Sequence, residues 1–327
     1  MTTSKPVCPP VDPEIAPALR LLSEGVPPSI TPEMIGAVRE YTAAQPVTDE
    51  ALRRNGTIEF EERTVPGPAG APDIGLLICR PAGVVGTVAG IYHTHGGGMF
   101  TGDNRTLLSP LLEWAVEFKA VVVSVEYRLA PEHPDPAPIE DCYAGLVWTA
   151  EHADELGIDP ARLLIAGTSA GGGLAAGTAL LARDRGGPEL IGQILMCPML
   201  DDRMRTPSSR MLHGEATWDF TSNQTGWTAL LGDRRGGPDV SGYTAPARAT
   251  DLTGLPPAFL DVGTVDTFRD EVVDYATRIW QAGGTAELNV WPGGFHGFTA
   301  VAPAAALSQA AESARTDWVR RQLGEGK

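Results

Sequence analysis

The chain has 327 residues, of which 43% are hydrophobic, and it carries a formal net charge of −16. This length and composition favour one large soluble α/β domain with an appendage over a disordered protein. The acidic charge argues against nucleic acids and anionic membrane surfaces as partners, because both call for clustered lysine and arginine. Residues 1–10 lack the features of a secretion signal, and no run approaches the roughly 20 apolar residues that span a bilayer. We therefore expect a cytoplasmic protein without stable membrane association.

The N-terminal residues 1–50 are predicted to form two short helices, each opened by a capping residue and a proline. The first follows Asp12-Pro13 and stops at Gly25, and the second follows Thr31-Pro32. The first strand candidate alternates apolar and charged residues, which is typical of an edge strand or an outlying hairpin. The three strand candidates in this part of the chain are 57–64, 74–80 and 87–92.

From residue 107 onward, helical stretches alternate with short apolar runs of the kind that forms parallel strands buried on both faces. The predicted strands are 121–125, 163–166, 191–196, 258–262 and 286–291. The predicted helices are 107–118, 139–152, 172–185, 270–281 and 304–322. Together these elements predict an α/β fold with an eight-stranded, mostly parallel sheet flanked by helices.

One connection, residues 197–257, is far longer than the few residues usual between a strand and the next element. We expect a helical cap made from residues 1–50 and an insertion at 201–243, placed on a core of residues 51–200 and 244–327. The apolar residues of the insertion either line a pocket or form the cap's own small core, and both interpretations stay open. These residues are Met204, Met211, Trp218, Phe220 and Trp227.

The four cysteines are scattered along the chain, with no C-x-x-C pair and no histidine at ligand spacing. This pattern predicts neither a structural metal site nor a disulfide framework. Cys79 and Cys197 lie in apolar, strand-like runs, so we expect them to be buried structural thiols.

A G-x-S-x-G motif lies between a predicted strand and a predicted helix, which is the context that a nucleophilic serine needs. In such a tight turn, Gly167, Ala170 and Gly171 leave room around Ser169, and its hydroxyl emerges at the positive end of a helix. The alternative is a packing turn of small residues, and the partners described below argue against it. The spacing of Gly171 and Gly173 also mimics a dinucleotide fingerprint, which we reject because the first glycine lies several residues beyond the strand.

A serine hydroxyl needs a base to take its proton, and His296 is the best placed of the six histidines. It follows the last predicted strand through a loop, at the strand end where ligands meet open α/β sheets. We expect His133 and His152 to be structural. His213 lies in the insertion, where it could touch a substrate but could not easily be held by an acid.

The acid that orients the histidine is expected between the serine and the histidine in chain order. Asp266 fits, because it lies just past the strand at 258–262. Asp261 falls inside that strand, and Asp270 opens the next helix, where an acid usually caps. A buried carboxylate beside the imidazole fixes its tautomer and stabilises the imidazolium.

A glycine-rich segment after an early strand, His95-Gly96-Gly97-Gly98, supplies the third requirement. Glycines let backbone N–H groups approach a substrate oxygen closely and point the same way. The predicted oxyanion-hole donors are the N–H groups of Gly97, Gly98 and Ala170. A bare glycine triplet on its own would more often be a flexible turn.

Taken together, these motifs resemble those of the bacterial hormone-sensitive-lipase-like esterases, over about residues 87–298 and in the branch with threonine before the nucleophile. The segments that carry the resemblance are 95–98, 127–132, 167–171, Asp266 with 269–271, and 295–298. The resemblance implies an α/β-hydrolase fold, a helical cap, no cofactor, and hydrolysis of short- to medium-chain acyl esters. It also implies that His95 shapes its loop. Thr267-Phe268 departs from the Pro-Leu usual after the family's triad acid.

We therefore expect a serine carboxylesterase in which Ser169 attacks, His296 relays the proton and Asp266 holds the histidine, with Met99, Trp218 and Phe220 on the pocket walls. The expected partner is a small-molecule ester, with no metal and no nucleic acid. Amidase, lactonase or interfacial lipase activity on the same residues stays open, as does a non-catalytic, ligand-binding member of the fold. The sequence also leaves open whether the chain forms a homodimer.

Overall fold

A single eight-stranded sheet with the order β1-β2-β4-β3-β5-β6-β7-β8 forms the centre of the computed structural model, which describes residues 6–25, 27 and 29–324. β1 pairs antiparallel with β2, and β2 pairs antiparallel with β4, whereas the other neighbours run parallel. The predicted fold class is therefore confirmed. The strands are β1 (Ile58–Val65), β2 (Ile74–Pro81), β3 (Val88–Thr94), β4 (Val121–Glu126), β5 (Ile158–Thr168), β6 (Gly192–Met196), β7 (Ala258–Val265) and β8 (Ala286–Phe295).

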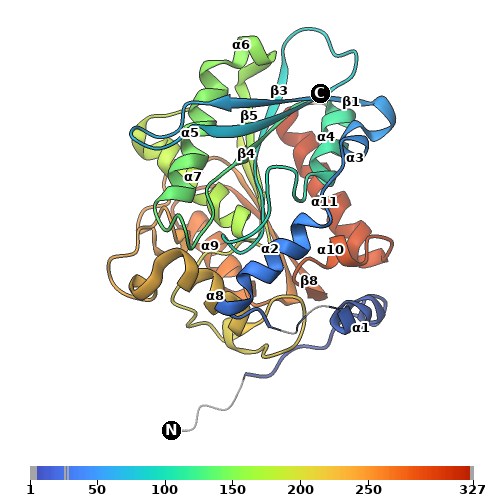
Figure 1. The fold of residues 1–327 in the computed structure, drawn as a ribbon, viewed down its shortest axis with the longest axis vertical. Coiled ribbons are helices and arrows are strands. Elements are labelled where there is room, and N and C mark those ends of the chain that lie inside the picture. Colours follow the sequence, from blue (N-terminus) through green and yellow to red (C-terminus); the bar gives the residue numbers. More distant parts are fainter. Residues whose placement is uncertain (1–5, 26, 28, 325–327) are drawn as a thin grey trace.

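Helices cover both faces of this sheet (Figure 1), because the inner strands are apolar on both sides. α4 (Ser109–Phe118) and α11 (Ala306–Leu323) pack on one face, where Trp114 and Trp318 are buried. α5 (Ala137–Glu151), α7 (Ala170–Arg185) and α9 (Arg269–Gln281) pack on the other. The short helices near them are α3 (Asp49–Arg53), α6 (Ala153–Leu156) and α10 (Phe298–Val301).

Three predicted strand boundaries are wrong by three residues or more: the start of β5, the end of β8, and the end of β7, which runs to Val265 instead of residue 262. β5 begins at Ile158, before the Asp159-Pro160 pair that reads as a turn. β8 continues through Pro292-Gly293-Gly294 to Phe295, because Phe295 still pairs with Val265 across a register shift. His296 therefore follows the strand directly, without the intervening loop that the glycines suggested.

The N-terminal helices α1 (Ala16–Gly25) and α2 (Ile35–Ala43) lie at the same end of the molecule as α8 (Phe220–Leu231) of the insertion (Figure 1). The two segments are hydrogen-bonded: Ser222 Oγ accepts the Ile30 N–H at 2.9 Å, and Thr225 Oγ1 donates to the Ile30 carbonyl at 2.8 Å. Thr31 makes no side-chain capping bond, since a 3₁₀ turn at Pro32–Met34 precedes α2. None of the helices in the described ranges is long and apolar enough to cross a membrane.

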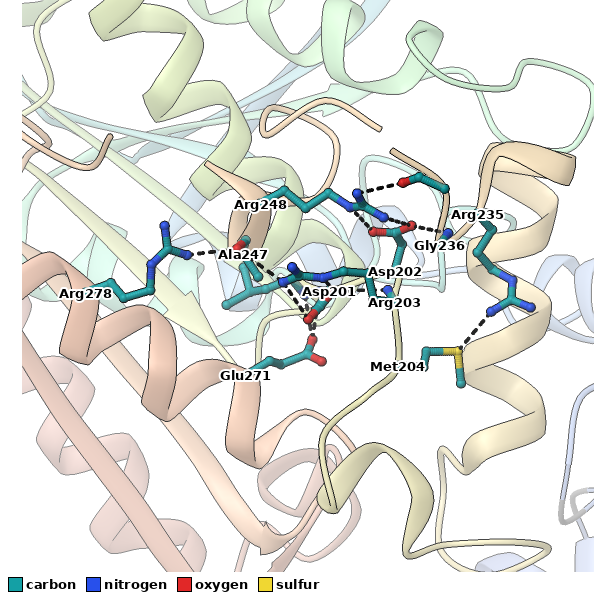
Figure 2. A network of polar contacts seen from close by, with 12 residues as sticks. Asp201, Asp202, Arg203, Met204, Arg235, Gly236, Ala247, Arg248, Glu271 and Arg278 are labelled. Atoms are coloured by element: carbon teal, nitrogen blue, oxygen red, sulfur yellow. Dashed lines mark hydrogen bonds and ion pairs between the residues drawn. The ribbon is translucent and has the colours of Figure 1, made fainter. Parts of the chain in front are cut away.

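A buried polar network fastens the insertion to the core (Figure 2). The fully buried Asp202 accepts hydrogen bonds from Arg248 Nε at 2.5 Å and Nη2 at 2.9 Å, and from the Gly236 N–H at 2.6 Å. Glu271 of α9 accepts the N–H groups of Leu200 and Asp201 at 2.7 and 3.2 Å. The network thus ties both ends of the insertion together and joins them to the helix that follows Asp266.

Candidate active site

Ser169 occupies a sharp turn between β5 and α7, with φ 60° and ψ −122°. Only glycine fits two residues before it and two residues after it. A Cβ on Gly167 would lie 2.2 Å from the Gly171 carbonyl oxygen, and a Cβ on Gly171 would lie 2.1 Å from the Thr94 carbonyl oxygen. The two glycines therefore let α7 begin immediately after the strand, and the strained serine is held at the helix N-terminus.

The structure brings together the three side chains predicted to act in catalysis. His296 Nε2 lies 2.9 Å from Ser169 Oγ, and His296 Nδ1 lies 2.8 Å from Asp266 Oδ2. Asp266 is fully buried, and its Oδ1 accepts the Phe268 N–H at 2.9 Å. Because a carboxylate oxygen only accepts, the imidazole carries its proton on Nδ1 and offers the Nε2 lone pair to the serine hydroxyl. This arrangement can remove a proton from Ser169.

Opposing effects act on the pKa of His296. Burial by itself lowers this pKa, because it penalises the charged imidazolium. The adjacent Asp266 carboxylate and the sulfur of Cys197 favour the imidazolium, and together they outweigh burial, so the pKa of His296 lies well above the ordinary value. The carboxylate therefore stabilises the charged ring that forms when Ser169 gives up its proton.

Cys197 is placed differently from the sequence-based prediction. It is buried, but it lies one residue beyond β6 with φ 38°, and it lines the cavity beside the imidazole. Its Sγ and one ligand atom each from Asp266 and His296 lie within 4.8 Å of one another, a set that could hold a metal ion. Such an ion would compete with the hydrogen bonds that both imidazole nitrogens already make to Ser169 and Asp266. Cys79 is buried inside β2, as predicted, and burial raises the pKa of its thiol to about 12.

The predicted oxyanion-hole segment lies against the serine turn: a Cβ on Gly96 would be 3.7 Å from Ser169 Cβ. Gly97 and Gly98 have φ values of 121° and 61°, which favour glycine. Among the described residues, their N–H groups donate to no backbone carbonyl, whereas the Gly97 carbonyl accepts from two later residues. Ala170 is the first residue of α7, where N–H groups lack a helical partner. Gly97 and Gly98 line the same cavity as Ser169.

His95 supports this segment without moving protons. Its ring stacks on Tyr127 with 4.0 Å between centroids, and the Tyr127 hydroxyl donates to the His95 carbonyl at 2.8 Å. Its Nδ1 donates to the Gly96 carbonyl at 2.8 Å. Burial lowers the pKa of His95 to about 4, so the ring is neutral near pH 7. The other candidate histidines, His133, His152 and His213, are not on the cavity wall.

A cavity of about 590 Å³ opens beside Ser169 and His296. Trp218 lines it, with its ring centroid 6.3 Å from that of His296. Met99 does not line it: its left-handed backbone directs the fully buried side chain into the core, near Gly173 of α7. Phe220 does not line it either, because it begins α8 and packs against the ring of His213. The predicted pocket role for those two residues is therefore wrong.

Much of the cavity wall was not predicted from the sequence. It comes from helix faces on the α4 and α11 side of the sheet and from a charged residue inside β7. No local motif marks these residues, because only the fold brings their elements together. They include Leu107, Pro110, Glu113, Asp261, Thr299, Ala300, Pro303, Glu312 and Arg315.

The loop after Asp266 is held by polar contacts that the sequence did not reveal. Asp270 does not cap its own helix; its Oδ2 accepts the Ser208 N–H at 2.8 Å. Ser208 Oγ donates to the Thr267 carbonyl at 3.0 Å. Thr267 Oγ1 donates to the Trp218 carbonyl at 2.8 Å, so the threonine that departs from the family's usual proline links the acid loop to the cavity wall. The insertion and the Asp266 loop thus support each other.

Comparisons with known proteins agree with this architecture. The sequence profile of an α/β-hydrolase fold family matches residues 91–300. Carboxylesterase NlhH of Mycobacterium tuberculosis is 38% identical over 310 residues, which cover 90% of this chain and 92% of that protein. The solved structure of a bacterial heroin esterase is 38% identical, with a TM-score of 0.87 and coverage of 96% of this chain and 98% of that one. Esterase LipW from Mycobacterium marinum is 32% identical, with a TM-score of 0.86 and coverage of 97% and 98%. The chain thus belongs to the hormone-sensitive-lipase-like esterase family of the α/β-hydrolase superfamily.

Proposed function

We propose that this chain hydrolyses carboxylic esters of short- to medium-chain acids through an acyl-enzyme. Ser169 Oγ attacks the ester carbonyl while His296 Nε2 takes the hydroxyl proton. The histidine then gives that proton to the departing alcohol, which leaves Ser169 esterified by the acyl group. Water, deprotonated by the same histidine, attacks the acyl-enzyme and releases the acid.

The negative charge that develops on the carbonyl oxygen is stabilised by the backbone N–H groups of Gly97, Gly98 and Ala170. Donors held in place before the reaction stabilise the transition state without reorganising, and removing one typically costs about 10²–10³-fold in kcat. The glycine geometry of the loop and the helix N-terminus support this assignment.

The observation that carries the proposal is the continuous chain of contacts from Ser169 Oγ through the imidazole to Asp266, with distances of 2.9 and 2.8 Å. The cavity of about 590 Å³ supports a small-molecule substrate, since ligand pockets commonly measure about 300–1,000 Å³. The names of the relatives, carboxylesterase and esterase, favour esters over amides and lactones. A purely ligand-binding role would be expected to lose one of the three side chains, and all three positions are filled.

The remaining expectations enter the same proposal. Residues 1–50 and 201–243 act as a cap over the core of residues 51–200 and 244–327, and the hydrogen bonds between residue 30 and α8 support this division. The enzyme works in the cytoplasm on small-molecule esters, without a nucleic-acid partner. A homodimer stays an open alternative.

The test is turnover of 4-nitrophenyl acetate by purified Ser169→Ala. Loss of the hydroxyl removes the nucleophile, so hydrolysis should fall to the background rate while the thermal unfolding midpoint stays near that of the parent. Ser23→Ala, which removes an exposed hydroxyl on α1, is the matched control and should keep full activity. A folded Ser169→Ala protein that still turns over the ester would refute the proposal.

A further inference from the structure

The cavity that reaches Ser169 also reaches a charged cluster formed by residues of β7 and α11. Asp261, Glu312 and Arg315 all line it, and we call these three residues the acidic wall. Asp261 and Arg315 are 1% and 5% exposed, so the cluster is largely shielded from solvent. Buried charges are costly unless they are paired, and the pairing here is incomplete.

All three guanidinium nitrogens of Arg315 contact oxygens of the protein. Its Nε and Nη2 each lie 2.8 Å from Asp261 Oδ2, and its Nη1 lies 2.6 Å from Glu312 Oε1 and 3.3 Å from Thr299 Oγ1. The positive charge of Arg315 is therefore already shared by Asp261 and Glu312. A carboxylate or phosphate on the substrate would be repelled by Asp261 and Glu312, because Arg315 is already paired with both of them.

Asp261, by contrast, keeps a free acceptor. Its Oδ2 accepts hydrogen bonds from Arg315 Nε at 2.8 Å and from Trp291 Nε1 at 3.1 Å, and it lies 2.8 Å from Arg315 Nη2 as an ion pair. Its Oδ1 is buried and, among the described residues, has no hydrogen-bond partner. An unpaired carboxylate oxygen on a cavity wall favours a ligand that donates a hydrogen bond, and most of all one that is positively charged.

The acidic wall also holds more negative than positive charge. Two carboxylates share one guanidinium, and Glu113 of α4 lies on the same cavity. Burial raises the pKa of Glu312, and the nearby carboxylates of Asp261 and Glu113 raise it further against the opposing effect of Arg315. Glu113 is itself paired with Arg54 at 3.1 Å, so the unmet negative charge lies at Asp261 and Glu312.

The acidic wall is close enough to the nucleophile for one ester to span both. Asp261 is the register partner of Met196 in the neighbouring strand. The Met196 carbonyl in turn accepts the Ser169 N–H at 2.8 Å. Only β6 lies between the Ser169 turn and Asp261. The acyl or the alcohol group of an ester whose carbonyl lies at Ser169 therefore has to cross one strand to reach the acidic wall.

We propose that the preferred substrates are esters with a protonated amine at the end of the acyl or alcohol group that faces the acidic wall. The free Asp261 Oδ1 and Glu312 would bind this amine. This proposal rests on the esterase activity proposed above and narrows its substrate class. The ammonium would donate to Asp261 Oδ1 and reduce the surplus negative charge.

The test uses esters that differ only in this charge, on either side of the ester bond. On the alcohol side, the acetate of 4-(aminomethyl)benzyl alcohol is compared with the acetate of 4-ethylbenzyl alcohol. On the acyl side, methyl 4-(aminomethyl)phenylacetate is compared with methyl 4-ethylphenylacetate. The rigid ring prevents the amine from attacking its own ester. For one of the two pairs, kcat/KM at neutral pH should be about tenfold higher for the ammonium ester, as expected for one charge-assisted hydrogen bond.

Variants assign any preference to the acidic wall. Asp261→Asn keeps the side-chain shape but removes the charge, and Glu312→Gln does the same at a half-buried position where folding is safer. Either change should reduce the tenfold preference, measured as the ratio of kcat/KM for the two esters of a pair, to about twofold or less. Glu117→Gln is the matched control, since Glu117 pairs with Arg320 between the same helices, α4 and α11, but does not line the cavity. It should leave the preference unchanged.

Binding to Ser169→Ala separates this proposal from the proposed reaction. Calorimetry with the same unhydrolysed esters should show the ammonium ester binding more tightly than its neutral partner, and Glu312→Gln in that background should remove the difference. Equal affinities and equal kcat/KM values in both pairs would overturn the ammonium preference even if Ser169 proves to be the nucleophile. A preference that survives both Asp261→Asn and Glu312→Gln would also overturn it. Discrimination in binding without turnover of any ester would instead contradict only the reaction.

Discussion

Replacing Asp266 with asparagine tests how the carboxylate controls the histidine. In the native site both carboxylate oxygens accept, Oδ2 from His296 Nδ1 at 2.8 Å and Oδ1 from the Phe268 N–H at 2.9 Å. An asparagine of the same shape offers only one acceptor. If its oxygen keeps the Phe268 bond, its NH₂ group faces Nδ1, and the imidazole must move its proton to Nε2. The ring would then donate to Ser169 and could not take its proton.

The expected loss in kcat is about 10⁴-fold, which corresponds to ~5 kcal/mol of activation free energy. The loss should fall on kcat far more than on KM, because the tautomer matters for proton transfer and not for ester binding. Unfolding should change by only about 1–3 kcal/mol, the cost of one unsatisfied buried polar group at a site that is 0% exposed. The large kinetic effect therefore cannot be explained by misfolding.

The assay is steady-state hydrolysis of 4-nitrophenyl acetate as a function of pH, with thermal unfolding measured on the same samples. Asp274→Asn is the matched control, since Asp274 is an exposed acid on α9, two turns beyond the loop. It should keep the parental kcat. A folded Asp266→Asn enzyme that retains more than about a tenth of the parental kcat would show that another group orients the histidine, since the tautomer argument requires a far larger loss.

Three further predictions follow from the same contacts. Burial lowers the pKa of His296, but Asp266 and Cys197 together raise it by more, so the acid limb of kcat/KM should lie above the ordinary histidine value of about 6.5, and a limb below that value in a pH profile would contradict this balance. In Gly98→Ala, the new Cβ would lie 2.5 Å from Trp218 Cη2 on a backbone with φ 61°, so kcat for 4-nitrophenyl acetate should fall by about 10²-fold; a parental kcat would exclude this loop from the oxyanion hole. Arg248→Met leaves the buried Asp202 without its cation and should lower the free energy of unfolding by about 3–5 kcal/mol in a denaturant titration, whereas a change below about 1 kcal/mol would mean that the network in Figure 2 contributes little.

The elements of the sheet could be predicted because each inner strand is a short apolar run between helical patterns. The ends of the five helices predicted from residue 107 onward were placed within two residues of those observed. The predictions failed where a local signal competed with pairing to a neighbour. Pro292-Gly293-Gly294 reads as a loop, yet the backbone there stays extended beside β7. Thr31 reads as a cap, yet its helix starts with a 3₁₀ turn.

The predicted catalytic residues could be found because each lies in a turn with its own local signature at a strand end. The cavity walls could not be found in that way. Met99 has the right position in sequence, but its left-handed backbone sends the side chain into the core. Asp261 was set aside because it lies inside a strand, and its contact with Arg315 depends on the packing of α11 against β7. Asp261 and Arg315 are 54 residues apart in the sequence, so no local sequence pattern indicates that they touch.

The most direct measurement of the central claim is mass spectrometry of the enzyme after reaction with a fluorophosphonate, which reacts with an activated serine hydroxyl. We expect one adduct per chain, located by peptide mapping on Ser169, no adduct in Ser169→Ala, and strongly slowed labelling in His296→Ala. An adduct on another residue, such as the neighbouring Cys197, or an active enzyme that takes no label, would contradict the assignment of Ser169 as the nucleophile.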